Sequence, residues 1–433
     1  MNYEQALDYI HGTYKFGSKL GLGNINYLLH LMENPHKGLK VIHVAGTNGK
    51  GSTCAYISSV LIEQGYRVGL YTSPYLEEFT ERIRVNGVNI PKEELAEITA
   101  YTKEKVELML SHGKNHPTEF EVVTAIGFEY FKRKKVDYLV LEVGLGGRGD
   151  STNVIDDPLV SVITPIDYDH VDYLGDTLGK IAFEKAGIIK NNCPVVTYPQ
   201  KEEAMEVIEG VSRELKAPVT IAPIAMAEIV SYDDSGQCFH VSYGEERIEN
   251  MKISMLGEHQ IQNATVALTA LYILESVHQI TISKEALYKG FMNANWPGRL
   301  EVIRRSPTII IDGAHNVHGM QALSRTIKTL YSEKNIVLVI GILGDKNVEG
   351  MLREIVPLAK RIVLTKPNNP RAMDLDMLAE KVSVYGKTTI KAEPIPSAVN
   401  EALNSSSIDD VIVFCGSLYM IGDVRSLLKE QNR

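Results

Sequence analysis

Residues 41–53, VIHVAGTNGKGST, decide the fold expected for this chain. A short β-branched run leads into a glycine-rich turn that contains one lysine, Lys50, and the helical-looking residues 55–64 follow. Glycines let backbone N–H groups face an anion, a helix N-terminus favours negative charge, and the lysine adds a positive charge. This order predicts a strand, a nucleotide-binding phosphate loop and a helix. The alternative is an ordinary strand-to-helix turn, because the spacing departs from GxxxxGK[ST].

The composition is that of an ordinary globular protein. The 433 residues are 44% hydrophobic and 23% charged, and their formal net charge is −9. The length favours two domains, and the acidic balance argues against a nucleic-acid or membrane-surface partner. Four scattered cysteines without CxxC spacing indicate free thiols in a reducing compartment. Without an apolar run of roughly 18 residues, we expect a cytoplasmic protein with no membrane span or signal peptide.

Strands and helices alternate after the phosphate loop. Apolar runs predict strands at 67–71, 137–143 and 159–164, and polar residues follow each of them. Helical spacing at 91–110 and 118–131 separates the runs, which favours a parallel sheet with its ligands beyond the C-terminal ends of the strands. The polar segment 75–86 has no clear periodicity, so we expect an irregular loop there.

The second half predicts a separate, smaller α/β domain. Alternating short runs at 218–256 indicate a small antiparallel region, and a long helix follows at about 258–276. Proline and glycine punctuate residues 296–300, which we interpret as a linker. We therefore expect a P-loop NTPase-like parallel-sheet domain at 1–295 and a Rossmann-like domain at 301–433. The strands predicted in the second domain are 308–311, 336–340, 361–364 and 411–414.

Four polar residues of the first domain could carry chemistry. Glu142 ends an apolar strand where a carboxylate would bind Mg²⁺ beside a triphosphate, and the alternative is a carboxylate that caps a helix or pairs with Arg148. Ser73 and His170 follow other strands, and each could be a turn or packing residue. Lys185 lies in a helix with apolar flanks, and a surface lysine beside Glu184 is an equal alternative.

Polar residues also follow strands in the second domain. Asp312 could accept a hydrogen bond from a ribose or order a turn, and His315 could bind a carboxylate or cap the next helix. Arg299 in the linker could reach a phosphate or form a surface salt bridge. Ser417 opens a helix after a strand and could seat a carboxylate.

Together these motifs resemble the folylpolyglutamate synthase/dihydrofolate synthase family of the Mur ligase superfamily over nearly the whole chain. In the first domain the resemblance rests on GTNGKGS (46–52), YTSP (71–74), LEVGLGGR (141–148) and FEKAG (183–187). It continues in HQIQNA (259–264), PGR (297–299), DGAHN (312–316) and GSLY (416–419). The atypical spacing of the phosphate loop is the form expected in this family.

The resemblance implies a site for ATP and for two Mg²⁺ ions. The metal sites would use Ser73, Glu142, His170 and a carbamylated Lys185. Physical chemistry supports the last of these, since a carbamate turns a cationic side chain into an anionic oxygen ligand. Catalytic roles fall to Lys50, Lys185 and His315, and His315 and Ser417 would hold the incoming glutamate. The implied ATP-binding residues are Gly46, Thr47, Asn48, Gly49, Lys50, Gly51, Ser52, Asn263, Arg299 and Asp312.

The resemblance also implies the reaction, in which ATP activates the terminal carboxylate of a folate as an acyl phosphate and L-glutamate displaces phosphate. Phe120, Glu121 and Asp150 are the candidate acceptor-binding residues, with a helix first turn as the alternative for Glu121. Members that also use dihydropteroate carry charged residues after the turn at Leu20, where this chain has Gly23-Asn24-Ile25. One phosphate loop and a site formed within one chain need no partner subunit, so we expect a monomer.

Two other functions compete with this interpretation. One is a different ligase of the superfamily acting on a UDP-linked substrate, but such enzymes have an extra N-terminal domain, and the roughly 40 residues before the phosphate loop are too few for one. The other is a nucleotide-binding regulatory protein that ligates nothing. A switch needs no second-substrate site, so Asp312, His315 and Ser417 argue against it.

Overall fold

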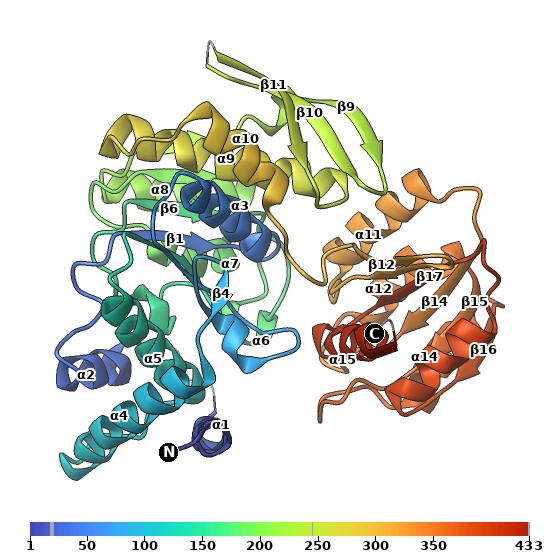
Figure 1. The fold of residues 1–433 in the computed structure, drawn as a ribbon, viewed down its shortest axis with the longest axis horizontal. Coiled ribbons are helices and arrows are strands. Elements are labelled where there is room, and N and C mark those ends of the chain that lie inside the picture. The colour runs from blue at the N-terminus through green and yellow to red at the C-terminus, as the bar shows by residue number, and fades with distance from the viewer. Residues whose placement is uncertain (18–20, 245, 432–433) are drawn as a thin grey trace. The chain divides into compact units, whose positions relative to one another are not determined.

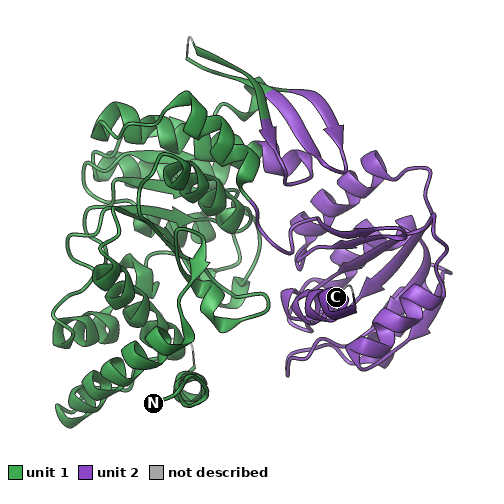
Figure 2. Ribbon diagram, viewed as in Figure 1, with its two compact units in different colours: residues 1–228, 240–251, 262–294 green, residues 229–239, 252–261, 295–433 purple. Residues whose placement is uncertain are grey.

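The structure is a computed structural model that describes residues 1–17, 21–244 and 246–431. It divides into two compact units, which Figure 2 shows in different colours. Unit 1 comprises residues 1–228, 240–251 and 262–294, and unit 2 comprises residues 229–239, 252–261 and 295–433. Unit 2 thus includes short segments before the linker that the sequence placed in the first domain. In the described part of the chain, no helix is both long and apolar enough to cross a membrane.

Unit 1 is built on an eight-stranded sheet with the order β4-β3-β2-β5-β1-β6-β7-β8. The strands are β1 (Val41–Ala45), β2 (Val68–Tyr71), β3 (Ile83–Val85), β4 (Val88–Asn89), β5 (Tyr138–Glu142), β6 (Val160–Ile163), β7 (Val195–Thr197) and β8 (Val219–Ile221). Strand β1 lies at the centre, parallel to β5 on one side and to β6 on the other. The phosphate loop therefore leaves the sheet from a central strand that is buried along its whole length.

One predicted feature of this sheet is wrong. Residues 75–86, expected to be an irregular loop, contain the short helix η2 (Phe79–Arg82) and strand β3. Strand β3 pairs antiparallel with β2, and β4 pairs antiparallel with β3, so this edge of the sheet is not parallel. Three residues are too few to show a period of two, and the pairing partner supplies the stability that the local sequence does not.

Helices cover both faces of the sheet in Figure 1. Val41, Leu139 and Tyr71 point to one face and form a core with apolar residues of α2, α4 and α5. Helix α3 follows the phosphate loop, contacts β1, β2 and β5, and packs against α10. The helices are α1 (Tyr3–Gly12), α2 (Gly23–Leu31), α3 (Lys50–Glu63), α4 (Lys92–Ser111), α5 (Glu119–Lys134), α6 (Val171–Leu174), α7 (Leu178–Lys185), α8 (Glu202–Glu214) and α10 (Lys284–Asn293).

The region predicted to be a small antiparallel sheet is a three-stranded sheet with the order β11-β10-β9. Its strands are β9 (Ala227–Asp233), β10 (Gly236–Tyr243) and β11 (Glu246–Ile253). The boundary between the units crosses these strands, and it also crosses helix α9 (Glu258–His278), which enters unit 1 at Gln262. The predicted long helix at 258–276 is confirmed.

Unit 2 is a second α/β unit, as the sequence predicted. Its six-stranded sheet has the order β12-β13-β17-β14-β15-β16, and only the edge pair β12–β13 is antiparallel. The strands are β12 (Glu301–Arg305), β13 (Thr308–Ile311), β14 (Ile336–Ile340), β15 (Ala359–Leu364), β16 (Thr388–Lys391) and β17 (Val411–Cys415). The helices are α11 (Val317–Leu330), α12 (Val348–Ile355), α13 (Leu375–Ser383), α14 (Ile395–Asn404) and α15 (Leu418–Gln431).

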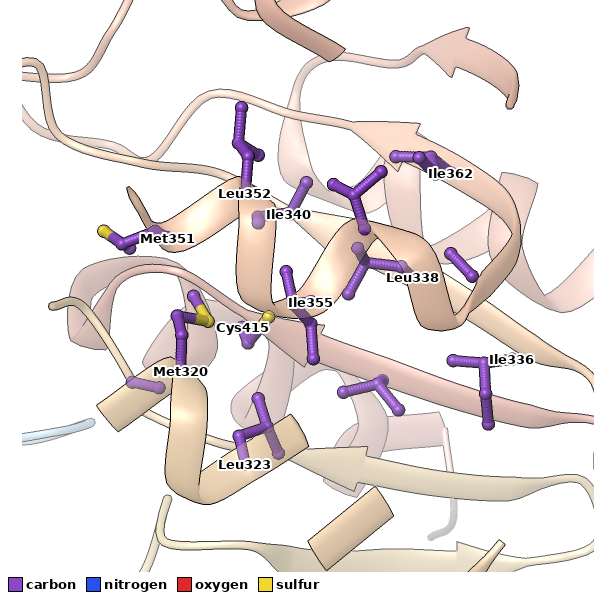
Figure 3. Packing of buried hydrophobic residues seen from close by; sticks show 14 of the residues in the cluster. Met320, Leu323, Ile336, Leu338, Ile340, Met351, Leu352, Ile355, Ile362 and Cys415 are labelled. Carbon is purple, nitrogen blue, oxygen red and sulfur yellow. The ribbon is translucent and has the colours of Figure 1, made fainter. Parts of the chain in front are cut away.

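The core of unit 2 explains this arrangement. Figure 3 shows Leu338 and Ile340 of the central strand β14 beside Ile355 and Leu352 of α12 and Met320 of α11. All five residues are at most 2% exposed, so the apolar stripes of the helices close one face of the sheet. The polar strand ends remain at one edge, where the predicted site residues of this unit lie.

Candidate active site

The phosphate loop passes so close to its neighbours that two of its glycines have no room for a side chain. A Cβ on Gly46 would lie 1.8 Å from Thr164 Oγ1, and one on Gly49 would lie 2.3 Å from Asn263 Oδ1. Gly49 also has a φ of +82°, which residues with a side chain rarely adopt. Asn263, which the sequence predicts to be part of the ATP site, thus lies directly beside this loop.

The backbone of the loop divides into an anchored part and a helix start. The N–H groups of Thr47 and Asn48 donate to Pro165 O at 2.9 and 3.3 Å, and the Thr47 hydroxyl donates to Asp167 O. These two residues hold the loop on the segment after β6. Helix α3 begins at Lys50 directly after the glycine-rich turn, and Gly49 supplies no side-chain cap. A helix start of this kind is the arrangement that binds anions.

Two lysines share one backbone carbonyl at the end of β1. Lys50 Nζ donates to Gly46 O at 3.1 Å and to Thr47 O at 3.3 Å, and Lys185 Nζ donates to the same Gly46 O at 2.9 Å. The Lys185 side chain is buried, so the alternative of a surface lysine is wrong. Burial, followed by the nearby Lys50 charge, lowers the pKa of Lys185 to about 7.

The predicted metal ligands lie at this same edge of the sheet. Glu142 ends β5, is buried, and accepts a hydrogen bond from Ser73 N–H at 3.1 Å. His170 is exposed at the start of α6, with Nε2 3.9 Å from Asp169 Oδ2, and its side chain does not cap that helix. In the described residues no three His, Cys, Asp or Glu side chains cluster as a metal site. The metal-binding roles of Ser73, Glu142, His170 and a modified Lys185 stay predictions.

A glycine-rich loop after β5 holds the helix that carries Lys185. A Cβ on Gly147 would lie 2.6 Å from Glu184 O, and one on Gly187 would lie 2.3 Å from Arg148 Cα. Arg148 N–H donates to Glu184 O at 2.7 Å. The two backbones therefore touch without intervening side chains, which fixes the C-terminal end of α7.

The predicted acceptor-binding residues lie around this loop. The Phe120 ring occupies the space beside Gly144, 2.4 Å from where a Cβ would be. The Glu121 carboxylate accepts from Thr118 N–H at 2.7 Å and completes a capping box, as the structural alternative predicted. Asp150 is buried and accepts from Leu145 N–H at 2.8 Å and Thr152 N–H at 3.0 Å. Roles of all three in substrate binding stay predictions.

In unit 2 the carboxylate of Asp312 orders the turn after β13. It accepts from Leu300 N–H at 2.8 Å and from Ala314 N–H at 2.7 Å. Burial raises its pKa, and the Arg299 guanidinium opposes this shift. A Cβ on Gly313 would lie 2.4 Å from Arg299 Nη1, so the glycine makes room for the arginine.

His315 and Ser417 lie at the ends of neighbouring strands. His315 Nδ1 donates to Gly313 O at 2.8 Å, which leaves Nε2 as the unprotonated nitrogen of the neutral ring. Ser417 is buried between β17 and α15, and its Oγ has no hydrogen-bond partner among the described residues. A buried hydroxyl without a partner costs free energy, so this atom calls for an explanation.

Comparison with known proteins identifies the family. Residues 44–271 match the Mur ligase middle domain, and residues 298–418 match the Mur ligase glutamate ligase domain. The dihydrofolate synthase/folylpolyglutamate synthase of Bacillus subtilis is 38% identical over 99% of both chains. The chain belongs to the folylpolyglutamate synthase/dihydrofolate synthase family of Mur ligases.

Solved structures agree with this assignment. A folylpolyglutamate synthase from Thermotoga maritima is 37% identical, with a TM-score of 0.87 over 99% of this chain and 97% of that one. The Mycobacterium tuberculosis enzyme complexed with ADP is 31% identical, with a TM-score of 0.90 over 99% of each chain. The chain is therefore an ATP-dependent ligase with the fold predicted from its sequence.

Sequence analysis missed one clamp near the site. Arg425 of α15 forms a fork with the carboxylate of Glu301, through Nε at 2.9 Å and Nη2 at 2.7 Å, and Glu301 accepts from Gly298 N–H. The contact fixes the segment that holds Arg299. No local pattern reveals a pair so far apart in sequence.

Leu20 belongs to the turn after which family members that use dihydropteroate carry charged residues. It lies outside the described residues.

Gly49→Ala should weaken nucleotide binding, because its Cβ would collide with Asn263. Gly65→Ala is the matched control at the other end of α3, since Gly65 has a φ of +98° but open space around its Cβ. Both changes place alanine in a left-handed conformation at a cost of about 1–2 kcal/mol of stability. By calorimetric titration with ATP, we expect about 10-fold weaker binding or more for Gly49→Ala only, as 1.4 kcal/mol corresponds to tenfold. Equal affinities for the two variants would contradict the assignment of this loop.

Proposed function

We propose that this ligase adds L-glutamate to the terminal carboxylate of tetrahydrofolates, with ATP as the energy source. The observation on which the proposal rests is the convergence of Lys50 and Lys185 on the Gly46 carbonyl at the mouth of the phosphate loop. The names of relatives aligned over nearly the whole chain support the substrates, since those from Bacillus subtilis and Lacticaseibacillus casei are folylpolyglutamate synthases.

The reaction joins a carboxylate to an amine in two displacements. The folate carboxylate oxygen attacks the γ-phosphorus of ATP, ADP leaves, and an acyl phosphate forms. The nitrogen of L-glutamate then attacks the acyl carbon, and phosphate leaves as the amide forms. Lys50 and the N–H groups that open α3 stabilise the charge on the transferring phosphoryl oxygens. Asn263, Arg299 and Asp312 keep their predicted roles in ATP binding.

Lys185 fits a carbamate better than an ammonium. An ammonium at this position lies against the Lys50 charge in a buried setting, which is why its pKa falls to about 7. Half of the amine is then neutral near pH 7, and only the neutral amine reacts with CO₂. A carbamate oxygen, with Glu142, Ser73 and His170, would supply the oxygen and nitrogen ligands for two Mg²⁺ ions. Bound Mg²⁺ would neutralise charge on the phosphates.

Ser417 and His315 are the proposed seat of the incoming glutamate. The buried Ser417 hydroxyl can donate to a carboxylate, and the start of α15 adds N–H groups and a favourable dipole. A bound carboxylate would supply the partner that the Ser417 hydroxyl lacks among the described residues. Phe120 and residues near it are proposed to contact the pterin ring.

Dihydropteroate is the proposed second acceptor. It differs from a folate in ending on a benzoate carboxylate, so the same activation and displacement would convert it to dihydrofolate. The Bacillus subtilis relative, 38% identical, carries both activities in its name, which favours this extension over a ligase with one acceptor. We also propose that the enzyme acts as a monomer, because its only predicted phosphate loop and its substrate residues belong to one chain.

Phosphate release and product mass test the proposed function together. With ATP, Mg²⁺ and L-glutamate, we expect release only when tetrahydrofolate or dihydropteroate is present, and a gain of one or more glutamyl residues on the acceptor. Gain on tetrahydrofolate alone would confine the enzyme to polyglutamylation. Release that does not depend on an acceptor would overturn the ligase substrates proposed here, and D-glutamate serves as the control nucleophile.

Carbamylation of Lys185 should be visible by ¹³C NMR in ¹³C-bicarbonate. Because the lowered pKa leaves the amine neutral above pH 7, the carbamate signal should be strong at pH 8 and fall as the amine protonates toward pH 6. At one unit below the pKa only about a tenth of the amine is neutral. Lys185→Met should abolish the signal and lower kcat about 100-fold or more. A signal that persists in Lys185→Met would contradict this assignment.

Ser417→Ala separates a ligand-binding hydroxyl from a structural one. Since Ser417 Oγ makes no hydrogen bond in the described protein, its removal should leave Tm unchanged, while KM for L-glutamate rises about 10-fold with the lost contact to charge. The control is Thr99→Val in α4, where the buried hydroxyl donates to Leu95 O at 2.7 Å and its loss should lower Tm. A fall in the Tm of Ser417→Ala with unchanged KM would reverse the interpretation.

A further inference from the structure

A buried histidine in the phosphate-loop strand is not used by the reaction described above. His43 is the middle residue of β1, between apolar neighbours, and its side chain is completely buried. Burying a polar ring in a central strand costs free energy unless it forms hydrogen bonds. His43 Nε2 lies 2.9 Å from the hydroxyl of Thr152, a residue 109 positions away in the short helix η3 (Ser151–Val154).

The proton positions in this contact follow from a second hydrogen bond, which Thr152 forms with Asp150. The Thr152 hydroxyl donates to Asp150 Oδ1 at 2.6 Å, and a hydroxyl has one proton. The oxygen of Thr152 must therefore accept from His43, so His43 Nε2 holds the ring proton. Burial lowers the pKa of His43 to about 3, so the ring remains neutral and this tautomer is kept at physiological pH.

Asp150 connects Thr152 to the glycine-rich loop after β5 through hydrogen bonds. Its Oδ1 accepts from Thr152 N–H, and its Oδ2 accepts from Leu145 N–H at the beginning of the loop. The carboxylate thus ties both ends of residues 145–152 together. Burial raises the pKa of Asp150, and the hydrogen bonds from Thr152 and Leu145 oppose this shift because they stabilise the ionised carboxylate.

The loop in turn holds the backbone of Lys185. Gly147 has no Cβ to separate it from the carbonyl oxygens of Glu184 and Lys185, and Asn153 Nδ2 bridges Arg148 O at 3.0 Å and Gly187 O at 3.1 Å. Lys185 Nζ then reaches Gly46 O, the residue directly after β1. The contacts form a closed circuit that begins and ends on the phosphate-loop strand.

We propose that His43 and Thr152 are positioning residues, which fix the glycine-rich loop and through it the Lys185 amine relative to the phosphate loop. The inference rests on the proposed function of Lys185 and extends it to two residues that are completely buried. A shift of about 1 Å at a reacting group can cost 100-fold in rate, and a buried hydrogen-bond circuit is a means of preventing that shift.

Thr152→Val tests the circuit, because valine keeps the shape of threonine and removes the hydroxyl. Thr99→Val is the matched control, since it removes another fully buried threonine hydroxyl far from the loop. Both variants should lower Tm by about 2–4 °C through one lost hydrogen bond. We expect kcat to fall about 10- to 100-fold in Thr152→Val only, with KM for the folate acceptor unchanged. Thr152→Ser, which restores the hydroxyl, should recover kcat.

Competitive acetylation of Lys185 with acetic anhydride, read by peptide mass spectrometry, gives a readout without turnover. Loss of the circuit should raise the acetylation rate of Lys185 about fivefold to tenfold in Thr152→Val, because a lost hydrogen bond eases local opening by this factor. His43→Leu should act in the same direction, and His43→Gln, which keeps a donor, should act less. Thr99→Val should leave the rate unchanged.

The two readouts separate the inference from the proposed function. If wild-type protein fails to add glutamate to folates, the proposed function fails, while Lys185 acetylation still tests the circuit. If Thr152→Val and Thr99→Val show equal Lys185 acetylation and equal kcat, His43 and Thr152 are structural residues only, and the positioning role is overturned.

Discussion

The close approach of the Gly46 backbone to Thr164 at the end of β1 is the constraint on which the rest of unit 1 depends. Gly46 passes so near Thr164 that no side chain fits, and this brings β1 and the segment after β6 into contact at the mouth of the phosphate loop. The carbonyl of Gly46 then becomes the acceptor for two lysines. A bulkier residue would separate these elements and remove the electrostatic environment that makes the Lys185 amine reactive.

That environment follows from burial more than from any special sequence around Lys185. Desolvation disfavours the charged amine first, and the Lys50 charge adds to the effect. The energetic cost of placing a lysine here is met by the packing of α7 on the glycine-rich loop, where Gly147 and Gly187 allow direct backbone contact. Folding free energy is thereby used to hold a side chain in a reactive state, as is common at catalytic sites.

Sequence reasoning predicted the parts of this arrangement that have a local signal. The phosphate loop has a distinctive order of residue types, and the central strands are long apolar runs, so both were predicted correctly. Strand β3 was missed because three residues show no periodicity and its partner β2 determines its conformation. Glu121 illustrates the opposite difficulty, since an acidic residue three positions after Thr118 fits both a capping box and a ligand contact, and the capping box is present.

Contacts between residues far apart in the chain leave no pattern in the local sequence. These contacts determine how the buried polar groups should be interpreted. Asp312 and Asp150 are buried carboxylates whose oxygens accept backbone N–H groups, so each is accounted for by the turn that it orders. No such turn explains the unpaired Ser417 Oγ. An unsatisfied hydroxyl alone is nevertheless weak support for a site, because Ser212 Oγ in the last turn of α8 is also unsatisfied. The difference is position. Ser417 lies two residues after the central strand β17 and immediately before helix α15, where ligands bind in α/β sheets, whereas Ser212 lies in the last turn of a helix. An orphaned polar atom therefore indicates a ligand only where the topology also brings backbone donors to the same place.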